Sequence, residues 1–368
     1  MEEERLTTKD LPDVTATQTM QGAYQGYIRH KLLVMVVLTV VVLTIATWSI
    51  SIGSISLSPV QIVTALLGQA DARTASVVWN MRLPRILTAI VAGIALALAG
   101  CAYQSTLRNP LASASTLGIS QGAAFGASIA IIVLSGGGPS NTVAYEGVTT
   151  SDPVTTAICA FGGAVLSTLI ILGLSRFREM TPESIVLLGV ALSALFTAGT
   201  TLVQYFADDS QVAAVVFWTF GDLSRVNYQQ LAIMASVTAI SAVFFFANRW
   251  NYNAMEASEG LAHGLGIPAN RLRLLSMLFA SAAAATVIAF CGTINFVGLV
   301  APHIMRRLLG SDYRYLLPAS ALAGAGLLLV SDILCHVIVQ PLILPISAIT
   351  SLVGAPIFIH LLFKGVRR

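Results

Sequence analysis

The sequence predicts an all-α membrane protein with about ten transmembrane helices. Of its 368 residues, 56% are hydrophobic and only 10% are charged, whereas about 25% of residues are charged in a soluble domain. Ten apolar runs follow one another along the chain, and most approach the length of about 20 residues that crosses a bilayer. The cations gather in alternate connecting segments, which is typical of a chain that crosses a membrane repeatedly.

The ten apolar runs alternate with polar segments from the N-terminal region to the C-terminus. They are residues 32–50, 86–107, 117–134, 154–174, 184–206, 231–247, 274–291, 296–305, 315–331 and 345–363. Because their number is even, both termini are expected on the same side of the membrane.

The chain before the first run is polar and rich in Thr, Gln and Glu. We expect residues 1–30 to be a mobile cytoplasmic tail and residues 31–368 to form one transmembrane domain. No cleavable signal peptide is expected, because the first run is long enough to span and lacks a small-residue cleavage site. The four cysteines lie in apolar runs without a CxxC pair, which predicts small buried side chains and no metal site.

The distribution of cations sets the expected orientation. With both termini in the cytoplasm, the outer segments hold only Arg73, Arg82, Arg85 and Arg225, and the inner segments hold the rest of the 20 Lys and Arg residues. The positive-inside rule therefore favours this orientation strongly.

Two outer segments are longer than a simple turn. Residues 135–153 are rich in Gly, Ser and Thr, which predicts a flexible loop. Residues 212–220 are apolar but too short to span. We expect them to form an interfacial or re-entrant helix at the outer surface, with Trp218 in the aromatic belt of the membrane.

Small residues recur at spacings that let helices approach closely in lipid. They are Gly93, Ala97, Gly100, Gly122, Gly126, Gly162, Gly163, residues 280–285, Gly324 and Gly326. Ionisable side chains occur at helix ends, where Asp332 and His336 lie one turn apart. A permeation path would therefore be lined by uncharged groups, and its driving force would come from elsewhere.

Residues 249–273 form the longest polar segment inside the chain, and we call them the knob. We expect a short helix at 254–261 with Glu256 and Glu259 facing water, and then a tight glycine turn. Pro268 suits the first turn of the following helix. On the cytoplasmic side, such a rigid knob suits docking into a partner protein, and an ordinary loop is the alternative.

The chain cannot bind ATP through a P-loop, which needs Gly-Lys-Ser or Gly-Lys-Thr. None of its three lysines, Lys9, Lys31 and Lys364, follows a glycine. The HExxH metalloprotease motif is absent as well. The protein is therefore passive, driven by an ion gradient, or driven by a separate ATPase, and the knob favours the separate ATPase.

Short motifs occur in a fixed order along the chain. They are Arg82-Leu83-Pro84-Arg85, Arg108-Asn109-Pro110-Leu111-Ala112, Leu117-Gly118-Ile119, Phe217-Trp218 before Gly221, Gly264-Leu265-Gly266-Ile267, residues 296–304 followed by Arg306, Leu316-Leu317-Pro318 before Gly324 and Asp332, Pro345-Ile346, and residues 352–358. Together they resemble the permease subunits of bacterial and archaeal ABC importers for iron-siderophores, haem and vitamin B12, the FecCD family. The resemblance covers the chain from about residue 32 onward.

The resemblance implies the type II ABC importer permease fold, in which two ten-helix subunits pair around a central path. We expect a homodimer, and a close heterodimer is the alternative. It also implies a cytoplasmic ATP-binding-cassette ATPase dimer and an extracytoplasmic substrate-binding protein. The expected cargo is an iron(III)-siderophore or a related metal chelate, with haem or a corrinoid as alternatives. No cofactor, bound metal or nucleic acid is expected.

The resemblance further assigns residues to the two partners. The element that couples to the ATPase is expected at Ala257, Ser258, Glu259, Gly260, Leu261, Gly264, Leu265 and Gly266. At the outer face, Arg82 and Arg85 are expected to pair as exposed charges with glutamates of the binding protein, and interface snorkelling is the alternative. Where the vitamin B12 permease has a third docking arginine, this chain has His336, so that contact is absent or pH-dependent.

Three smaller features complete the expectations. Asn109-Pro110 predicts an inner turn, because proline disfavours helix in the residue before it. Pro302 and Pro356 predict helix kinks or caps. His303 is expected to be a packed side chain, since no second metal ligand lies at a suitable spacing.

Two other classes of function stay open. An ion-coupled secondary carrier would need a buried ionisable site or an inverted repeat with broken helices. An integral membrane enzyme would need His and carboxylate side chains that converge at one face of the membrane, whereas the five His residues are scattered along the chain.

Overall fold

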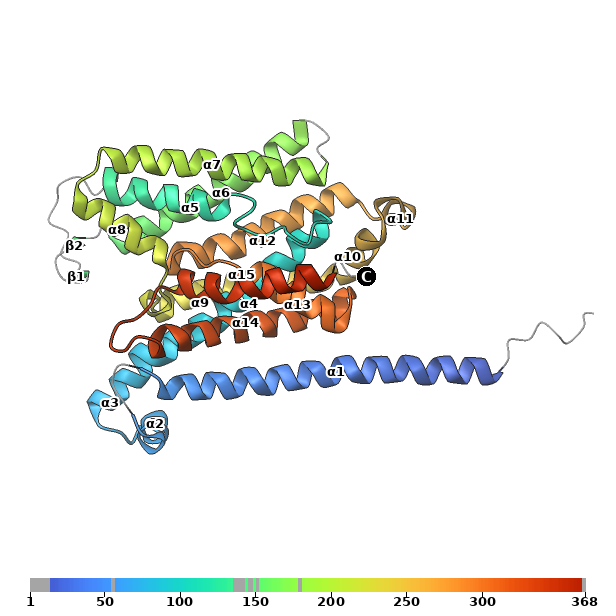
Figure 1. Ribbon diagram of the computed structural model, residues 1–368, viewed down its shortest axis with the longest axis horizontal. Coiled ribbons are helices and arrows are strands. Elements are labelled where there is room, and N and C mark those ends of the chain that lie inside the picture. Colours follow the sequence, from blue (N-terminus) through green and yellow to red (C-terminus); the bar gives the residue numbers. More distant parts are fainter. Residues whose placement is uncertain are drawn as a thin grey trace, which may run out of the picture.

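The computed structural model describes residues 14–53, 57–134, 143–144, 148–149, 152–177 and 181–365, and helices dominate it (Figure 1). The α-helices are α1 (Val14–Ser51), α2 (Pro59–Leu66), α3 (Ala72–Ser76), α4 (Leu83–Thr106), α5 (Ile119–Ser128), α6 (Pro153–Phe177), α7 (Pro182–Tyr205), α8 (Asp209–Phe220), α9 (Tyr228–Ala247), α10 (Arg249–Ala257), α11 (Glu259–Gly264), α12 (Ala269–Cys291), α13 (Val297–Leu309), α14 (Tyr313–Val337) and α15 (Ile346–Gly365). The π-helical segments η1 (Val77–Arg82) and η2 (Ile129–Leu134) adjoin α4 and α5, and η4 (Leu223–Arg225) is a short 3-10 helix. Two short strands, β1 (Val143–Ala144) and β2 (Val148–Thr149), pair antiparallel.

Each of the ten predicted apolar runs falls on a helix. Among the described residues, seven helices are long and apolar enough to cross a membrane, and two shorter apolar helices occupy Ile119–Leu134 and Ile346–Leu361. The remaining run, residues 296–305, falls on α13. The predicted all-α fold class is therefore confirmed.

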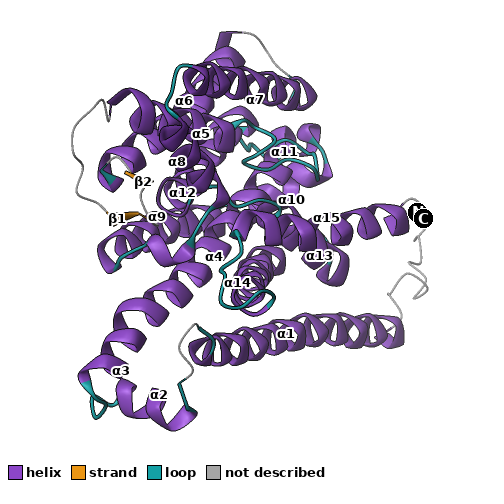
Figure 2. Ribbon diagram, turned by 60° about the vertical axis from the view of Figure 1, so that its left-hand side comes forward, coloured by secondary structure: helices purple, strands orange, loops and turns teal. Residues whose placement is uncertain are grey.

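The central helices of the bundle are buried, and its edges are not. Figures 1 and 2 show α1 along one edge and α7 along the opposite edge, with α4, α12 and α14 between them. In the most apolar 18-residue stretch of α1, only 11% of the residues are buried, whereas 78% are buried in the corresponding stretch of residues 72–106. Lipid tails are as apolar as leucine, so the exposed apolar surface of α1 suits contact with lipid.

Different helices and strands lie at the two ends of the bundle. Helix α1 begins and α15 ends at the end that carries α10 and α11, which we call the knob end (Figure 1). Helices α2, α3 and α8 and both strands lie at the opposite end. This arrangement agrees with an even number of crossings.

Helix α4 approaches α13 and α14 through glycine, as the spacing of small residues predicted. A Cβ atom added at Gly100 would overlap the carbonyl oxygen of Gly298 in α13, and one at Gly93 would overlap that of Gly324 in α14. In lipid, such close backbone packing is a main source of helix association. Gly162 differs, because an added Cβ would meet nothing within 4 Å.

Part of the predicted N-terminal tail is helical, and part of a predicted outer loop forms two short strands. The chain is helical from Val14, because extending an existing helix costs less than starting one, and residues 1–13 lie outside the described residues. Most of the predicted loop at 135–153 is also outside them, although β1 and β2 pair within it. The predictions did not include α2, where Ser58 and Gln61 form a reciprocal capping box.

The predicted outer helix exists, but one assignment within it is wrong. Helix α8 covers residues 212–220 as expected. The side chain of Trp218 is only 5% exposed and packs in the protein core, so it does not lie in an aromatic belt. Pro302 and Pro356 lie inside α13 and α15.

The close contacts at these glycines predict that a larger residue there lowers the stability of the protein. We expect Gly100→Ala to destabilise the protein by roughly 3 kcal/mol or more, because the new methyl group overlaps the backbone of α13. The melting temperature of the purified protein in detergent would measure this loss. Gly162→Ala is the matched control and should melt like the wild type, and a wild-type melting temperature for Gly100→Ala would contradict the prediction.

Candidate functional site

The knob consists of two short helices and a turn. Helix α10 ends at Ala257, and Ser258 adopts an extended backbone with φ of −167°. The Ser258 hydroxyl accepts a hydrogen bond from the amide of Leu261 at 3.0 Å and so caps α11. The predicted continuous helix at 254–261 is therefore wrong, because this cap starts a new helix inside it.

The turn after α11 needs one glycine. Gly266 has φ of +74°, a conformation that favours glycine, whereas Gly260 and Gly264 lie within α11. The predicted glycine turn therefore depends on Gly266, and Gly260 and Gly264 are helical. Pro268 immediately precedes α12, as predicted.

The predicted coupling residues form one projecting segment of the knob, from Ala257 to Gly266. Leu265 is 64% exposed, and Leu261 is exposed one turn before it, whereas Ala262 is buried beneath them. Ala257, Gly260, Gly264 and Gly266 are also exposed. The segment thus presents apolar side chains and bare backbone to whatever lies outside the bundle.

Polar side chains fix α10 to the bundle beneath this segment. Glu256 accepts hydrogen bonds from Arg306 of α13 and from the hydroxyl of Tyr313 in α14. The Asn253 amide donates to Asp312 at 3.0 Å and accepts from the Tyr313 backbone at 2.8 Å. Glu256, expected to face water, has a side chain that is 31% exposed but paired with Arg306 and Tyr313. The sequence did not single out Asn253 or Tyr313.

Asp312 is a strongly held carboxylate at the start of α14. It lies outside the membrane-spanning helices and accepts hydrogen bonds from Asn253 and Arg314. Burial raises the pKa of Asp312, but the hydrogen bonds from Arg314 and Asn253 outweigh burial and lower it to about 2. Asp312 is therefore ionised at neutral pH.

Helix α12 ties the knob to α4. Arg273 donates from Nε to the carbonyl of Thr106 at the end of α4, at 3.1 Å. The hydroxyls of Tyr252 in α10 and Ser276 in α12 lie 2.8 Å apart. The knob therefore contacts each of the central helices.

At the opposite end, the two predicted docking arginines are buried. Arg82 is 3% exposed and donates to the Ile50 carbonyl at 2.6 Å, and Arg85 is 5% exposed and donates to the Ile52 carbonyl at 3.2 Å. Arg85 Nε also lies 3.2 Å from a carboxylate oxygen of Asp332. The assumption that both arginines are exposed charges is wrong for this structure.

His336 turns inward and completes the same cluster. Its Nδ1 lies 2.8 Å from the Asp332 carbonyl, and its Nε2 lies 2.8 Å from Nη1 of Arg85. A carbonyl can only accept and a guanidinium can only donate, so this geometry fits a neutral ring with its proton on Nδ1. His336 therefore holds Arg85 within the subunit and does not project toward a partner.

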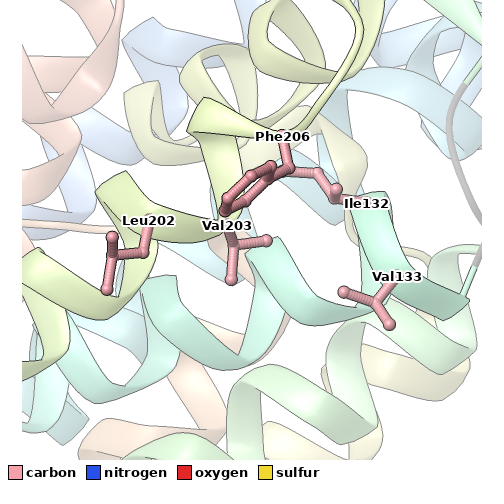
Figure 3. A pocket seen from close by; sticks show the side chains of 5 residues that line it. All are labelled: Ile132, Val133, Leu202, Val203 and Phe206. Atoms are coloured by element: carbon pink, nitrogen blue, oxygen red, sulfur yellow. The ribbon is translucent and has the colours of Figure 1, made fainter.

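The hollow between η2 and α7 is lined only by hydrocarbon. It measures about 300 Å³ and lies among Ile132, Val133, Leu202, Val203 and Phe206 (Figure 3). Among the described residues, no group of three or more His, Cys, Asp or Glu side chains is arranged to hold a metal ion. His303 packs edge-on against Phe358, as a packed histidine would.

One formal match to the GxSxG hydrolase motif occurs at Gly118, Ser120 and Gly122. In hydrolases the serine lies on a sharp turn between a strand and a helix, with an exposed hydroxyl. Here a turn leads into α5, and Ser120 is buried. The match therefore lacks the structural setting of a nucleophile.

The family model described as the FecCD transport family matches residues 36–364, which is most of the chain. The chain belongs to this family. This assignment confirms the resemblance that the ordered motifs indicated.

Similar proteins from other organisms carry related descriptions. A protein of Methanocaldococcus jannaschii described only as an ABC transporter permease is 45% identical over 345 residues, 94% of this FecCD chain and 98% of the relative. The Fe(3+)-citrate import system permease of Bacillus subtilis is 36% identical over 84% of this chain and 89% of its own. The hemin transport system permease of Yersinia pestis is 34% identical over 78% and 83%, respectively.

Solved structures share the fold. An inward-facing structure of an ABC transporter assigned to the metal-chelate type matches with a TM-score of 0.77 and 29% identity, over 90% of this chain and 98% of that chain. The PsaBC complex of Streptococcus pneumoniae, at 18% identity and a TM-score of 0.54, has the same fold. This FecCD protein is therefore a permease subunit of the ABC transporter class and a multi-pass protein of the cell membrane.

The buried Arg85–Asp332 ion pair predicts that loss of the Asp332 carboxylate strongly lowers the stability of the subunit. We expect Asp332→Ala to destabilise the subunit by roughly 3–5 kcal/mol, because a buried guanidinium loses its carboxylate. Melting temperature in detergent would report the change. Asp209→Ala, at an exposed position in the first turn of α8, is the control and should have little effect. Equal melting temperatures for the two variants would refute the structural importance of the pair.

The lowered pKa of Asp312 predicts a defined pH window. Its folded-state pKa of about 2 lies below the ordinary value of 3.8. The stabilisation by its ion pair is therefore complete above about pH 4 and is lost as the pH falls toward about 2. The difference in melting temperature between wild type and Asp312→Asn should stay constant from pH 7 to 5 and shrink below pH 4. A difference that grows on acidification would contradict this sign.

Proposed function

We propose that this chain is the membrane subunit of an ATP-driven importer for an iron(III)-siderophore or a related iron chelate. Two copies of the chain would pair around a central path. The observation that carries the proposal is the exposed segment from Ala257 to Gly266, which stands on a polar network at the knob end. A segment so placed can receive movement from a partner and pass it to the membrane helices.

The knob end would face the cytoplasm, where ATP is available. Most of the Lys and Arg residues belong to segments at this end, which agrees with the positive-inside rule. The chain has no P-loop of its own, so hydrolysis would occur on a separate pair of ATP-binding-cassette subunits. Leu261 and Leu265 would be the apolar contacts of α11 with them.

The opposite end would receive an extracytoplasmic binding protein that delivers the chelate. The binding protein would dock through Arg82 and Arg85, provided that Arg85 is released from its partner within the subunit. A carboxylate of the binding protein would have to compete with Asp332 for Arg85, because Arg85 is already paired within the subunit. His336 would then influence docking through its hold on Arg85 and not through a direct contact.

An iron chelate is the proposed cargo on two grounds. The relatives include permeases described for Fe(3+)-citrate and for hemin. The ionisable side chains lie at helix ends, so a path between two copies would be lined by uncharged groups, which suits a bulky solute that slides past without being gripped. Haem and corrinoids remain alternatives of the same class.

An ion-coupled secondary carrier is the second candidate, because Arg85, Asp332 and His336 form a buried ionisable cluster. Carriers of that class usually keep such a group near the middle of the membrane. Here Asp332 and His336 lie in the last turns of α14, close to the helix end at Val337. This position favours a structural role for the cluster.

Reconstitution in sealed vesicles distinguishes the two candidates. The vesicles would hold the permease with its proposed ATPase subunits and binding protein, and would be offered Fe(3+)-citrate, hemin and cyanocobalamin as probes. The proposal predicts uptake of an iron probe that needs ATP, is abolished by vanadate and persists with an ionophore. Uptake that an ionophore abolishes and vanadate leaves intact would favour the carrier, and uptake of cyanocobalamin alone would overturn the iron assignment.

Substitution of either Gly264 or Gly266 is predicted to abolish coupling, for a different structural reason in each case. Gly266→Val should distort the turn, because valine disfavours φ of +74°. Gly264 has an ordinary helical backbone and open space around it, so Gly264→Val changes only the outer surface. We expect both variants to assemble in the membrane and bind the ATPase weakly, yet to lose ATP-dependent uptake, which co-purification and the vesicle assay would measure. Unchanged uptake by both would refute the role of the knob.

A further inference from the structure

Helix α10 lies between the exposed coupling segment and the membrane helices. It has only nine residues, and its neighbours along the chain are bends at Asn248 and Ser258. A helix of this length is not stable by itself. Without side-chain ties, α10 would pivot at these bends and absorb any displacement of α11.

Three side chains close a triangle of polar contacts at the base of α10. Arg306 donates to one carboxylate oxygen of Glu256, and the Tyr313 hydroxyl donates to the other at 3.1 Å. Arg306 also donates to the Tyr313 hydroxyl at 3.1 Å. Glu256 thus joins α10 to both α13 and α14 through charge-assisted hydrogen bonds, which are the stronger kind.

The triangle is only partly exposed to water. Tyr313 is fully buried, the Arg306 side chain is 18% exposed, and the Glu256 side chain is 31% exposed. The Tyr313 ring also packs against that of Tyr252, with centroids 5.5 Å apart. Because the contacts are partly desolvated, solvent screens them less than it screens an ion pair at the surface.

A second set of contacts, one turn earlier on α10, holds the same neighbour. Asn253 binds both Asp312 and the Tyr313 backbone amide at the start of α14. The Arg314 guanidinium lies 4.7 Å from the ring centre of Trp250. All these ties converge on the junction of α13 and α14, although α10 continues in the chain to α12.

Helix α14 connects this junction to the opposite end of the bundle. Along its length it is pressed against α4 at Gly324 and Gly93. Near its far end, Asp332 pairs with Arg85 of α4. A displacement applied at Tyr313 would therefore move a stiff, well-packed element that reaches both faces of the membrane.

We propose that Glu256 is a positioning residue that locks α10 to Arg306 and Tyr313, so that ATP-driven displacement of α11 moves α14. This role rests on the proposed function, in which an ATPase displaces α11. The competing route is the chain itself, which passes from α11 directly into α12. In that case, Glu256 would only stabilise the fold.

Distance measurements between spin labels separate the two routes without knowledge of the cargo. Labels would be placed at Val337→Cys, at the far end of α14, and at Leu202→Cys on α7, both exposed positions. Cys159, the one native cysteine that is not buried, would be replaced by serine. The complex with its ATPase subunits would be measured without nucleotide and with ATP and vanadate.

The variants are Glu256→Gln, which removes the charge, and Tyr313→Phe, which removes only the hydroxyl. Arg271→Gln, an exposed cation of the same knob, is the control. In the parent and in Arg271→Gln, nucleotide should shift the distance by about 1–2 Å or more. In Glu256→Gln and Tyr313→Phe the shift should be lost, while ATPase binding and the nucleotide-free distance stay unchanged.

A shift that survives in Glu256→Gln, or a parent whose α14 does not move although its ATPase binds ATP, would overturn the role of Glu256. If Glu256→Gln fails to accumulate in membranes, Tyr313→Phe decides in the same way. Failure of the proposed function has a different signature, because no ATPase subunit would then co-purify with the parent chain. The two failures are therefore distinguishable.

Discussion

Close backbone packing of α4 against α13 and α14 is the constraint on which the rest of this structure depends. In lipid, burial of apolar side chains gives helices little reason to associate, so contact between backbones must supply it. Gly93 against Gly324 and Gly100 against Gly298 remove the side chains that would hold the helices apart. With these contacts in place, polar clusters at both ends of α14 fall into register with their partners on α4, α10 and α13.

The distribution of charge follows from the same constraint. Ionisable groups are costly in the middle of a bilayer, so they lie at the helix ends, where they pair. At the knob end, Glu256 and Arg306 attach α10 to the bundle. At the opposite end, the ion pair of Arg85 and Asp332 joins α4 to α14. Charge placed in this way stabilises the packed helices at both ends and leaves their middle sections apolar.

The sequence predicted the ten helices and the place of the knob, because hydropathy and glycine spacing are local signals. It did not predict the break at Ser258, although the serine before Leu261 is a capping signal in retrospect. It also missed the partners of Arg82, Arg85 and Glu256. Their partners are distant in sequence, with a separation of 251 positions between Arg85 and His336, and only the packed fold brings them together. From the sequence alone, a charged residue at a helix end is expected to be exposed, because its partner in the folded protein cannot be identified.

The central claim is that the projecting segment at residues 257–266 is where an ATPase drives this membrane protein. Hydrogen–deuterium exchange of the permease, measured with and without its ATPase subunits, tests this contact most directly. The account predicts slower exchange of the amides at 257–266 in the complex and unchanged exchange at 338–345, in the loop at the opposite end. Unchanged exchange at 257–266 in a complex that still binds the ATPase would contradict it.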